Sequence, residues 1–158
     1  MKVVIASEFA GYPLKQIVKD YLISSGHDVT DVGQVDENKK MLYPEAAKNL
    51  AKAIQTGKYD KGIVICGSGA GVSIVCNKFK GVYAVACESM FTAKGIPQIN
   101  NANVLAMGNN VVGPKNACAM VDLFLERYFA YGESEERKEF LTGMLNSVKE
   151  IEKENFKD

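Results

Sequence analysis

The residue pattern that most clearly indicates a reactive site is a cysteine that follows a run of β-branched residues and precedes three alternating glycines. The run 63–65 predicts a buried parallel strand, so Cys66 lies at its carboxyl end, where open α/β sheets place ligands. Gly67, Gly69 and Gly71 allow a sharp turn, and the apolar spacing that follows predicts a helix whose N-terminus attracts anions and favours a thiolate nearby. A nucleophile or base beside an anion-binding loop is therefore expected. A structural turn with an inert buried cysteine is the alternative.

Short β-branched runs alternate with segments of helical period, and this alternation predicts a parallel sheet covered on both faces. Because consecutive crossovers are right-handed, the expected fold class is α/β: a three-layer αβα, doubly wound, five-stranded sheet of Rossmann-like type. The expected strands span 2–6, 28–32, 62–66, 82–86 and 103–107. The expected helices span 13–24, 44–55, 69–78, 91–97 and 114–129.

A charged segment with one narrow apolar stripe follows this pattern. The stripe recurs at helical spacing and consists of Phe140, Leu141, Met144, Leu145, Val148 and Ile151. Because the sheet is already covered on both faces, we expect the stripe to dock on a second subunit, with packing onto its own domain as the alternative. Residues 1–130 are thus expected to form the Rossmann-like domain, and 131–158 its C-terminal amphipathic helix at a subunit interface.

The composition argues against several classes of protein. A chain of 158 residues suffices for one domain with its own core. Its 19 basic and 19 acidic residues cancel, which argues against a nucleic-acid or lipid partner. No apolar run could cross a membrane, and four cysteines without C-x-x-C spacing, with no signal peptide before Val3, favour a reduced cytoplasmic protein. Because no residue cluster has metal-ligand spacing, neither a metal nor another cofactor is expected.

Four segments, in order and at matching spacing, resemble motifs of the family of ribose-5-phosphate isomerase B and galactose-6-phosphate isomerase. They span 7–15, 43–44, 65–78 and 100–108. The most specific is I-C-G-S-G-A-G-V-S-I at 65–74, similar to the family's I-C-G-T-G-x-G-M-S-I. The resemblance implies an aldose–ketose isomerase of a small sugar phosphate, by default ribose 5-phosphate and ribulose 5-phosphate of the pentose phosphate pathway. It also implies a homodimer or tetramer with a shared active site.

The resemblance assigns roles to individual residues. Cys66 matches the base that moves a proton between C1 and C2, and the Ser68 hydroxyl with the glycine-loop amides matches the groups that hold the enediolate oxygens. A thiolate among amides also meets the physical demand for a base and preorganised donors. The implied substrate-binding residues are Glu8, Phe9, Tyr43, Gly67, Gly69, Ala70, Gly71, Asn100 and Arg137, the last reaching the phosphate from the neighbouring subunit. The alternatives are a helix cap for Glu8, a turn cap for Asn100 and a solvated charge for Arg137.

The sequence departs from the family at several polar positions. Phe9 and Ile99 stand where the family has histidines, the second credited with opening the sugar ring, and Glu133 replaces the first phosphate-binding arginine. The one histidine, His27, precedes the second expected strand. An open-chain tetrose 4-phosphate needs no ring opening, so we expect it to be handled better than ribose 5-phosphate. A galactose-6-phosphate subunit and a catalytically silent sugar-phosphate-binding subunit are the alternatives.

Overall fold

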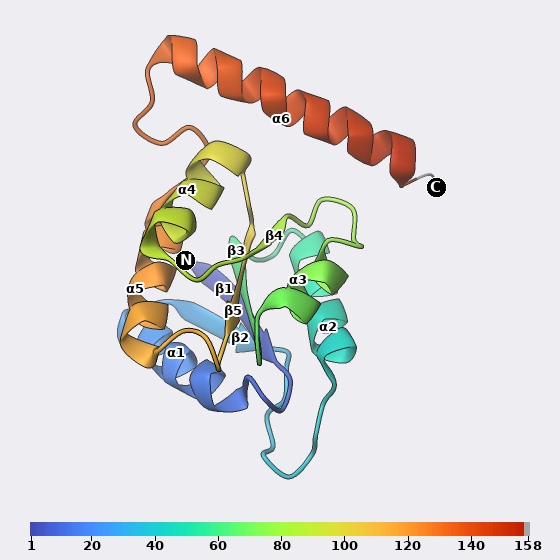
Figure 1. Cartoon of the computed structure of the whole chain (residues 1–158), viewed down its shortest axis with the longest axis vertical. Coiled ribbons are helices and arrows are strands. Elements are labelled where there is room, and N and C mark those ends of the chain that lie inside the picture. The colour runs from blue at the N-terminus through green and yellow to red at the C-terminus, as the bar shows by residue number, and fades with distance from the viewer. Residues whose placement is uncertain (157–158) are drawn as a thin grey trace.

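A five-stranded parallel sheet forms the middle of three layers in the computed structural model, which describes residues 1–156 (Figure 1). The strands are β1 (Lys2–Ser7), β2 (Asp28–Asp31), β3 (Lys61–Cys66), β4 (Ala84–Ala86) and β5 (Val104–Gly108). The helices are α1 (Tyr12–Ser24), α2 (Tyr43–Gln55), α3 (Ala70–Cys76), α4 (Met90–Asn100), α5 (Pro114–Glu126) and α6 (Glu135–Asn155). The expected doubly wound α/β fold is confirmed.

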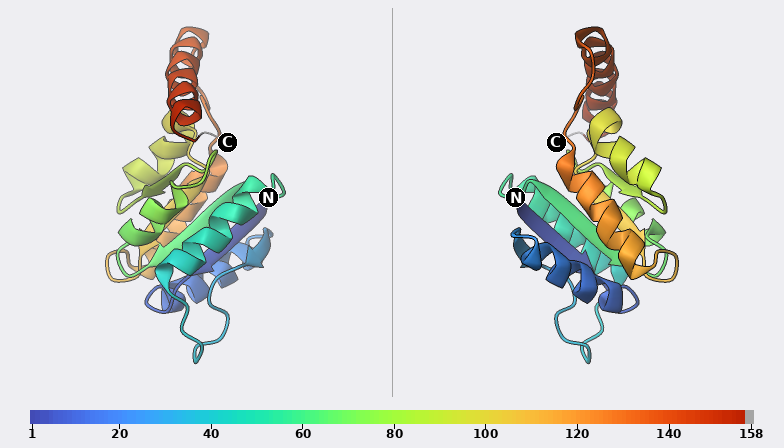
Figure 2. Two further views of the ribbon diagram at one scale, coloured as in Figure 1. Left: turned by 90° about the vertical axis from the view of Figure 1, so that its right-hand side faces the viewer. Right: turned by 90° about the vertical axis from the view of Figure 1, so that its left-hand side faces the viewer.

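The central strands are apolar on both faces because helices cover both sides of the sheet. In β1, Val3 and Ile5 join the core beneath α1, α4 and α5, whereas Val4 and Ala6 face α2 and α3. Figure 2 shows these two groups of helices on opposite sides of the sheet. Burial on both faces explains why the central strands are continuous hydrophobic runs in the sequence.

All strands are parallel and lie in the order β2-β1-β3-β5-β4, and the side of the sheet to which the chain adds strands changes between β1 and β3. From β1 the chain adds β2 on one side and then returns to place β3 on the other. Such a reversal leaves a crevice at the carboxyl ends of the two strands. Ser7 ends β1 and Cys66 ends β3, as predicted for Cys66, so the segments after both strands lie at this crevice.

Helices α1 and α2 each begin one residue before the predicted start, and three other helices differ from the sequence-based prediction by more than one residue. Helix α3 begins at Ala70 because Gly69, with φ of 82°, is its left-handed N-cap, and it ends at Cys76, two residues before the predicted end. Helix α4 continues past Pro97 to Asn100, since a proline close to the helix end interrupts little of the remaining hydrogen bonding. Helix α5 stops before residue 129 because Arg127 is extended, with φ of −104° and ψ of 144°.

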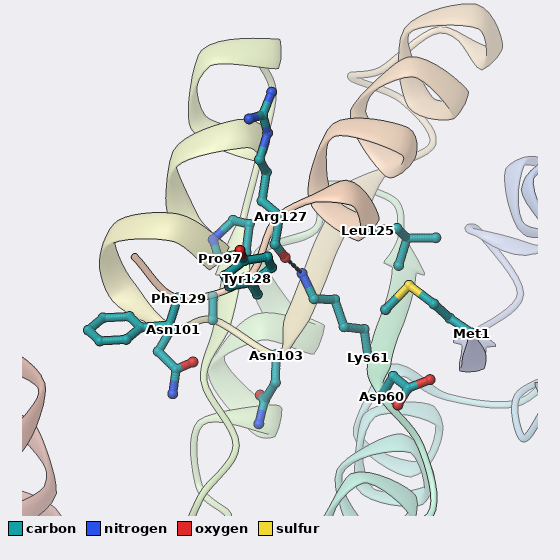
Figure 3. A pocket seen from close by; sticks show the side chains of 11 residues that line it. Met1, Asp60, Lys61, Pro97, Asn101, Asn103, Leu125, Arg127, Tyr128 and Phe129 are labelled. Atoms are coloured by element: carbon teal, nitrogen blue, oxygen red, sulfur yellow. Dashed lines mark hydrogen bonds between the residues drawn. The ribbon is translucent and has the colours of Figure 1, made fainter. Parts of the chain in front are cut away.

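A buried lysine at the amino end of β3 explains where α5 stops. The Lys61 ammonium donates to the carbonyl oxygens of Phe124 and Arg127, the second at 2.5 Å (Figure 3). Positive charge stabilises the carbonyl end of a helix. Burial lowers the pKa of Lys61 to about 8, so the group still carries its charge at neutral pH. The adjoining cavity of about 420 Å³ lies at the opposite end of β3 from Cys66.

Helix α6 lies across one end of the three-layer body (Figure 1). Its far end is held by Glu152, whose carboxylate accepts hydrogen bonds from the Gly81 N–H at 2.6 Å and the Tyr83 hydroxyl at 3.2 Å. Leu141 is the buried residue of this helix. Most of the predicted apolar stripe is exposed in the single chain, namely Phe140, Met144, Val148 and Ile151.

Gly11 allows the start of α1 to touch the end of β3. A Cβ atom on Gly11 would lie 2.3 Å from the Ile65 carbonyl oxygen, whereas one on Gly95, in α4, would meet nothing within 4 Å. We expect Gly11→Ala to lower the free energy of unfolding by about 2–3 kcal/mol through overpacking. Gly95→Ala is expected to raise it by about 0.5–1 kcal/mol because alanine favours helix. Urea unfolding tests both variants, and equal effects would contradict the close contact at Gly11.

The Tyr83 hydroxyl couples the docking of α6 to pH. Burial raises its pKa, and the neighbouring Glu152 carboxylate raises it further. A tyrosine whose pKa rises on folding contributes stability below its unfolded value of about 10 and loses that contribution at higher pH. We expect Tyr83→Phe to flatten the fall in unfolding free energy as pH rises above about 10, measured by urea titration. Tyr59→Phe, which removes a hydroxyl without a hydrogen bond to described residues, is the control, and identical slopes would refute this coupling.

Candidate active site

A cavity of about 370 Å³ opens at the carboxyl ends of β1 and β3. Three segments form it: the turn after β1, the start of α2 and the glycine loop after β3. Its lining residues are Glu8, Phe9, Ala10, Leu42, Tyr43, Cys66, Gly67, Ser68 and Gly71. All of these except Ala10 and Leu42 are residues that the sequence analysis predicted for the site. Gly69 and Ala70, also predicted, lie in the same glycine loop.

Cys66 is the cysteine best placed for proton transfer. It is 6% exposed, and its Sγ accepts a hydrogen bond from the Gly69 N–H at 3.1 Å. A donor aimed at sulfur stabilises negative charge there. Burial raises the pKa of Cys76 to about 12 and that of Cys87 to about 11, so these two thiols are uncharged at neutral pH. The Cys66 sulfur therefore combines a polar contact with access to the cavity.

The glycine loop is held in shape by the segment after β5. Asn109 donates its backbone N–H to the Cys66 carbonyl oxygen at 2.8 Å, and Asn110 does so to the Gly67 carbonyl oxygen at 3.0 Å. A Cβ on Gly108 would lie 2.6 Å from the Ser68 carbonyl carbon, so the two segments meet backbone to backbone. The loop that carries the catalytic candidates is thus fixed by main-chain contacts.

Ser68 belongs to this loop, two residues before the start of α3. Its Oγ accepts a hydrogen bond from the Ala70 N–H at 3.3 Å. A hydroxyl that accepts in this way keeps its own hydrogen to donate. Ser68 can therefore stabilise an oxyanion in the cavity together with the backbone N–H groups around it.

Glu8 holds the turn before α1 with both oxygens of its carboxylate. One oxygen accepts from the Ala10 N–H at 3.0 Å and the other from the Gly11 N–H at 2.9 Å, and the residue is 4% exposed. Both donors precede the first residue of α1, so Glu8 orders the turn that leads into the helix and does not cap the helix itself. Because carboxylate oxygens have further lone pairs and Glu8 lines the cavity, these two bonds leave room for a substrate hydroxyl to donate to it.

Two aromatic rings stand at the mouth of the cavity. Phe9 is 45% exposed, and Tyr43 is 47% exposed. The Tyr43 ring packs over Gly71, where a Cβ would come within 3.0 Å of it. The mouth is therefore a partly apolar opening that a small substrate can enter.

Asn100 and Arg137 lie outside this cavity in the single chain. Asn100 ends α4 and lines a second cavity of about 330 Å³, together with Ile99, Tyr83 and residues of α6. Arg137, near the start of α6, stacks 5.1 Å from the centre of the Phe140 ring. The predicted site is thus divided between two regions of the chain.

The chain offers no imidazole to the Cys66 cavity. His27 precedes β2, at the opposite end of the sheet, and lines a separate cavity with Met1, Asp122, Leu125 and Glu126. Among the described residues, no group of three or more histidine, cysteine or acidic side chains is arranged to hold a metal ion. None of the helices described is both long enough and apolar enough to span a membrane.

Sequence reasoning missed four contributors to the site, of which Ala10 lines the cavity within a motif that the sequence analysis had already singled out. Asn109 and Asn110 follow β5 at the same sheet edge as Cys66, and this position could have revealed them. Leu42 lines the cavity just before α2. An apolar residue in a loop gives no chemical signal, so the sequence alone could not identify Leu42.

The chain is similar to known proteins over most of its length. The sequence profile of the ribose/galactose isomerase family matches residues 3–141. A 4-deoxy-4-sulfo-D-erythrose isomerase from Clostridium sp. strain MSTE9 is 42% identical over 96% of both chains. A D-erythrulose-4-phosphate isomerase from Pectobacterium atrosepticum is 36% identical over 85% of this chain and 88% of the relative.

The solved structure of ribose-5-phosphate isomerase B from Clostridium thermocellum superposes with a TM-score of 0.88. It is 36% identical, and the match covers 98% of this chain and 99% of that one. The superposition includes nearly the whole chain, so it extends to α6 as well as to the sheet. The chain therefore belongs to the ribose/galactose isomerase family and is an aldose–ketose isomerase of that family.

Proposed function

We propose that the chain interconverts the aldose and ketose forms of a four-carbon, open-chain sugar that ends in a phosphate or sulfonate group. The observation that carries this proposal is the absence of an imidazole around Cys66: the described cavity is lined by Phe9, Tyr43 and the glycine loop, and the one histidine lies elsewhere. Pentose and hexose phosphates are mostly closed rings and need a group that opens them. A four-carbon sugar that carries its anionic group at C4 cannot close a five-membered ring.

In this mechanism Cys66 is the base. Its thiolate removes the proton from C2 of the aldose and later returns it to C1, while the hydroxyl proton moves from O2 to O1. Negative charge develops on the enediolate oxygens between these steps. The Ser68 hydroxyl and the N–H groups of the glycine loop stabilise that charge, because preorganised donors in a site shielded from water lower the barrier. Glu8 accepts a sugar hydroxyl, and Tyr43 covers the carbon chain.

The names of two relatives support a four-carbon substrate. One is a 4-deoxy-4-sulfo-D-erythrose isomerase and the other a D-erythrulose-4-phosphate isomerase. Ribose 5-phosphate, the default from the family resemblance and the substrate named for the solved relative, is the second candidate. A galactose-6-phosphate subunit is the third. A silent binding subunit is disfavoured because Cys66 and its Gly69 contact are in place.

A second copy of the chain completes the site in this proposal. The exposed stripe on α6 supplies apolar surface for docking, with Phe140 at 56% and Met144 at 55% exposed. Asn100 and Arg137, which lie outside the Cys66 cavity of their own chain, would approach the cavity of the partner. Two chains are the smallest such assembly, and a tetramer is compatible with the same contact.

The role of Cys66 is tested by removing its sulfur. We expect Cys66→Ala to retain the fold and to reduce isomerisation by about 10² or more, the scale of general-base removal. Cys118→Ala is the matched control, because Cys118 is a partly exposed free cysteine that does not line the cavity. Both are assayed on erythrulose 4-phosphate and 4-deoxy-4-sulfoerythrulose after purification to constant activity. Wild-type turnover by Cys66→Ala would exclude the sulfur as the base.

The substrate is tested by comparing acyclic and cyclic sugars. We expect a higher kcat/KM for erythrulose 4-phosphate or its sulfo analogue than for ribose 5-phosphate. Ile99→His should raise kcat/KM for ribose 5-phosphate by about tenfold or more, since it restores a general acid–base group. Ile99→Leu, the apolar control, should leave it unchanged. Fast turnover of ribose 5-phosphate by the natural protein, with no gain from the histidine, would mean that another group opens the ring.

A further inference from the structure

The cavity around Cys66 contains no positive charge of its own. Glu8 is the one charged residue among those that line it. A phosphate or sulfonate loses its hydration when it binds, and this loss is costly unless a cation or several N–H donors replace the water. If the substrate is as proposed above, its anionic end therefore needs a cation near the mouth of this cavity.

Lys40 places an ammonium group at that mouth. Its Nζ lies 5.2 Å from the centre of the Phe9 ring, and Phe9 lines the cavity. Lys40 belongs to the loop that joins β2 to α2, the loop that also contributes Leu42 to the lining. The Lys40 ammonium thus lies against a ring that lines the Cys66 cavity, just outside the lining itself.

The loop that carries Lys40 is anchored on both sides of its neighbour Met41. The Met41 N–H donates to Oε1 of Gln34 at 3.0 Å, and the Met41 carbonyl oxygen accepts from the Phe9 N–H at 3.3 Å. Gln34 is itself held by the fully buried Lys15, whose ammonium donates to the Gln34 carbonyl oxygen. The backbone beside Lys40 is therefore fixed to the wall of the cavity.

Lys40 also has its charge available. The adjacent Lys39 pairs with Asp36, Nζ to Oδ2 at 3.9 Å. Lys40 forms neither an ion pair nor a hydrogen bond with the residues described, and its contact is with the face of the Phe9 ring. A ring face attracts the cation but accepts no strong hydrogen bond, so the three N–H groups of Lys40 remain free for an anion.

We propose that Lys40 binds the terminal phosphate or sulfonate of the substrate, from the same chain that supplies Cys66. An ammonium group acts as a point charge with three donors, which suits either anion. This assignment deepens the proposed function and rests on it. It adds an anion contact within one chain to the contact that Arg137 of a second copy would make.

The kinetic test compares two neighbouring lysines. We expect Lys40→Met to raise KM by about tenfold with kcat within about twofold, because an anion contact shared by ground and transition states affects binding alone. Lys40→Arg should stay within about threefold of the natural protein in KM, since it keeps the charge. Lys39→Met, which removes a lysine already paired with Asp36, should leave KM unchanged. Equal KM changes in Lys39→Met and Lys40→Met, or no change in either, would overturn the assignment.

A second readout does not depend on turnover. Iodoacetamide alkylates accessible thiols, and peptide mass mapping distinguishes Cys66 from the other cysteines. We expect inorganic phosphate to slow alkylation of Cys66 in the natural protein and in Lys39→Met, with about fivefold more phosphate needed in Lys40→Met. If no sugar is isomerised but this difference is found, the proposed function fails and the Lys40 site stands. If phosphate gives no protection, or protects both variants equally, the Lys40 site is refuted even where sugars are turned over.

Discussion

The site depends on a close meeting of main chains at the end of β3, where there is no space for side chains. A Cβ on Gly11 would lie 2.3 Å from the Ile65 carbonyl oxygen, and one on Gly108 would lie 2.6 Å from the Ser68 carbonyl carbon. The first contact brings the start of α1 against the end of β3, and the second brings the end of β5 against the glycine loop. As a result, the loop amides are held in place before a substrate binds, which is the condition under which N–H groups stabilise an oxyanion effectively.

Much of this arrangement follows from the sequence. The alternation of β-branched runs with helical segments is sufficient to predict the sheet and the place of Cys66, because burial on both faces leaves a long-range pattern in the residues. The ends of α3, α4 and α5 were predicted less well. Each depends on a single feature: a left-handed Gly69 before α3, a tolerated Pro97 in α4, and the Lys61 ammonium at the end of α5, a contact between residues more than 60 positions apart.

The residues around the cavity also show what a prediction from sequence alone cannot find. The position of Glu8 was predicted, but only the structure shows both of its oxygens accepting N–H groups at the start of α1. Lys40 gave no signal because an exposed lysine in a polar loop is common. Its significance arises from the Gln34 and Phe9 contacts that hold the loop against the cavity. Asn100 and Arg137 lie apart from Cys66 in one chain, so their predicted role requires a second copy.

The central claim is that Cys66 of one chain and Arg137 of another form one working site, and mixing two impaired variants tests it most directly. Cys66→Ala and Arg137→Ala are purified separately, shown to have low activity at subsaturating substrate, then mixed, unfolded and refolded together. In a mixed dimer, one of the two sites regains both residues. With random pairing, the account predicts recovery of roughly a quarter of the natural activity. No recovery, when native mass spectrometry shows that mixed dimers have formed, would contradict the shared site.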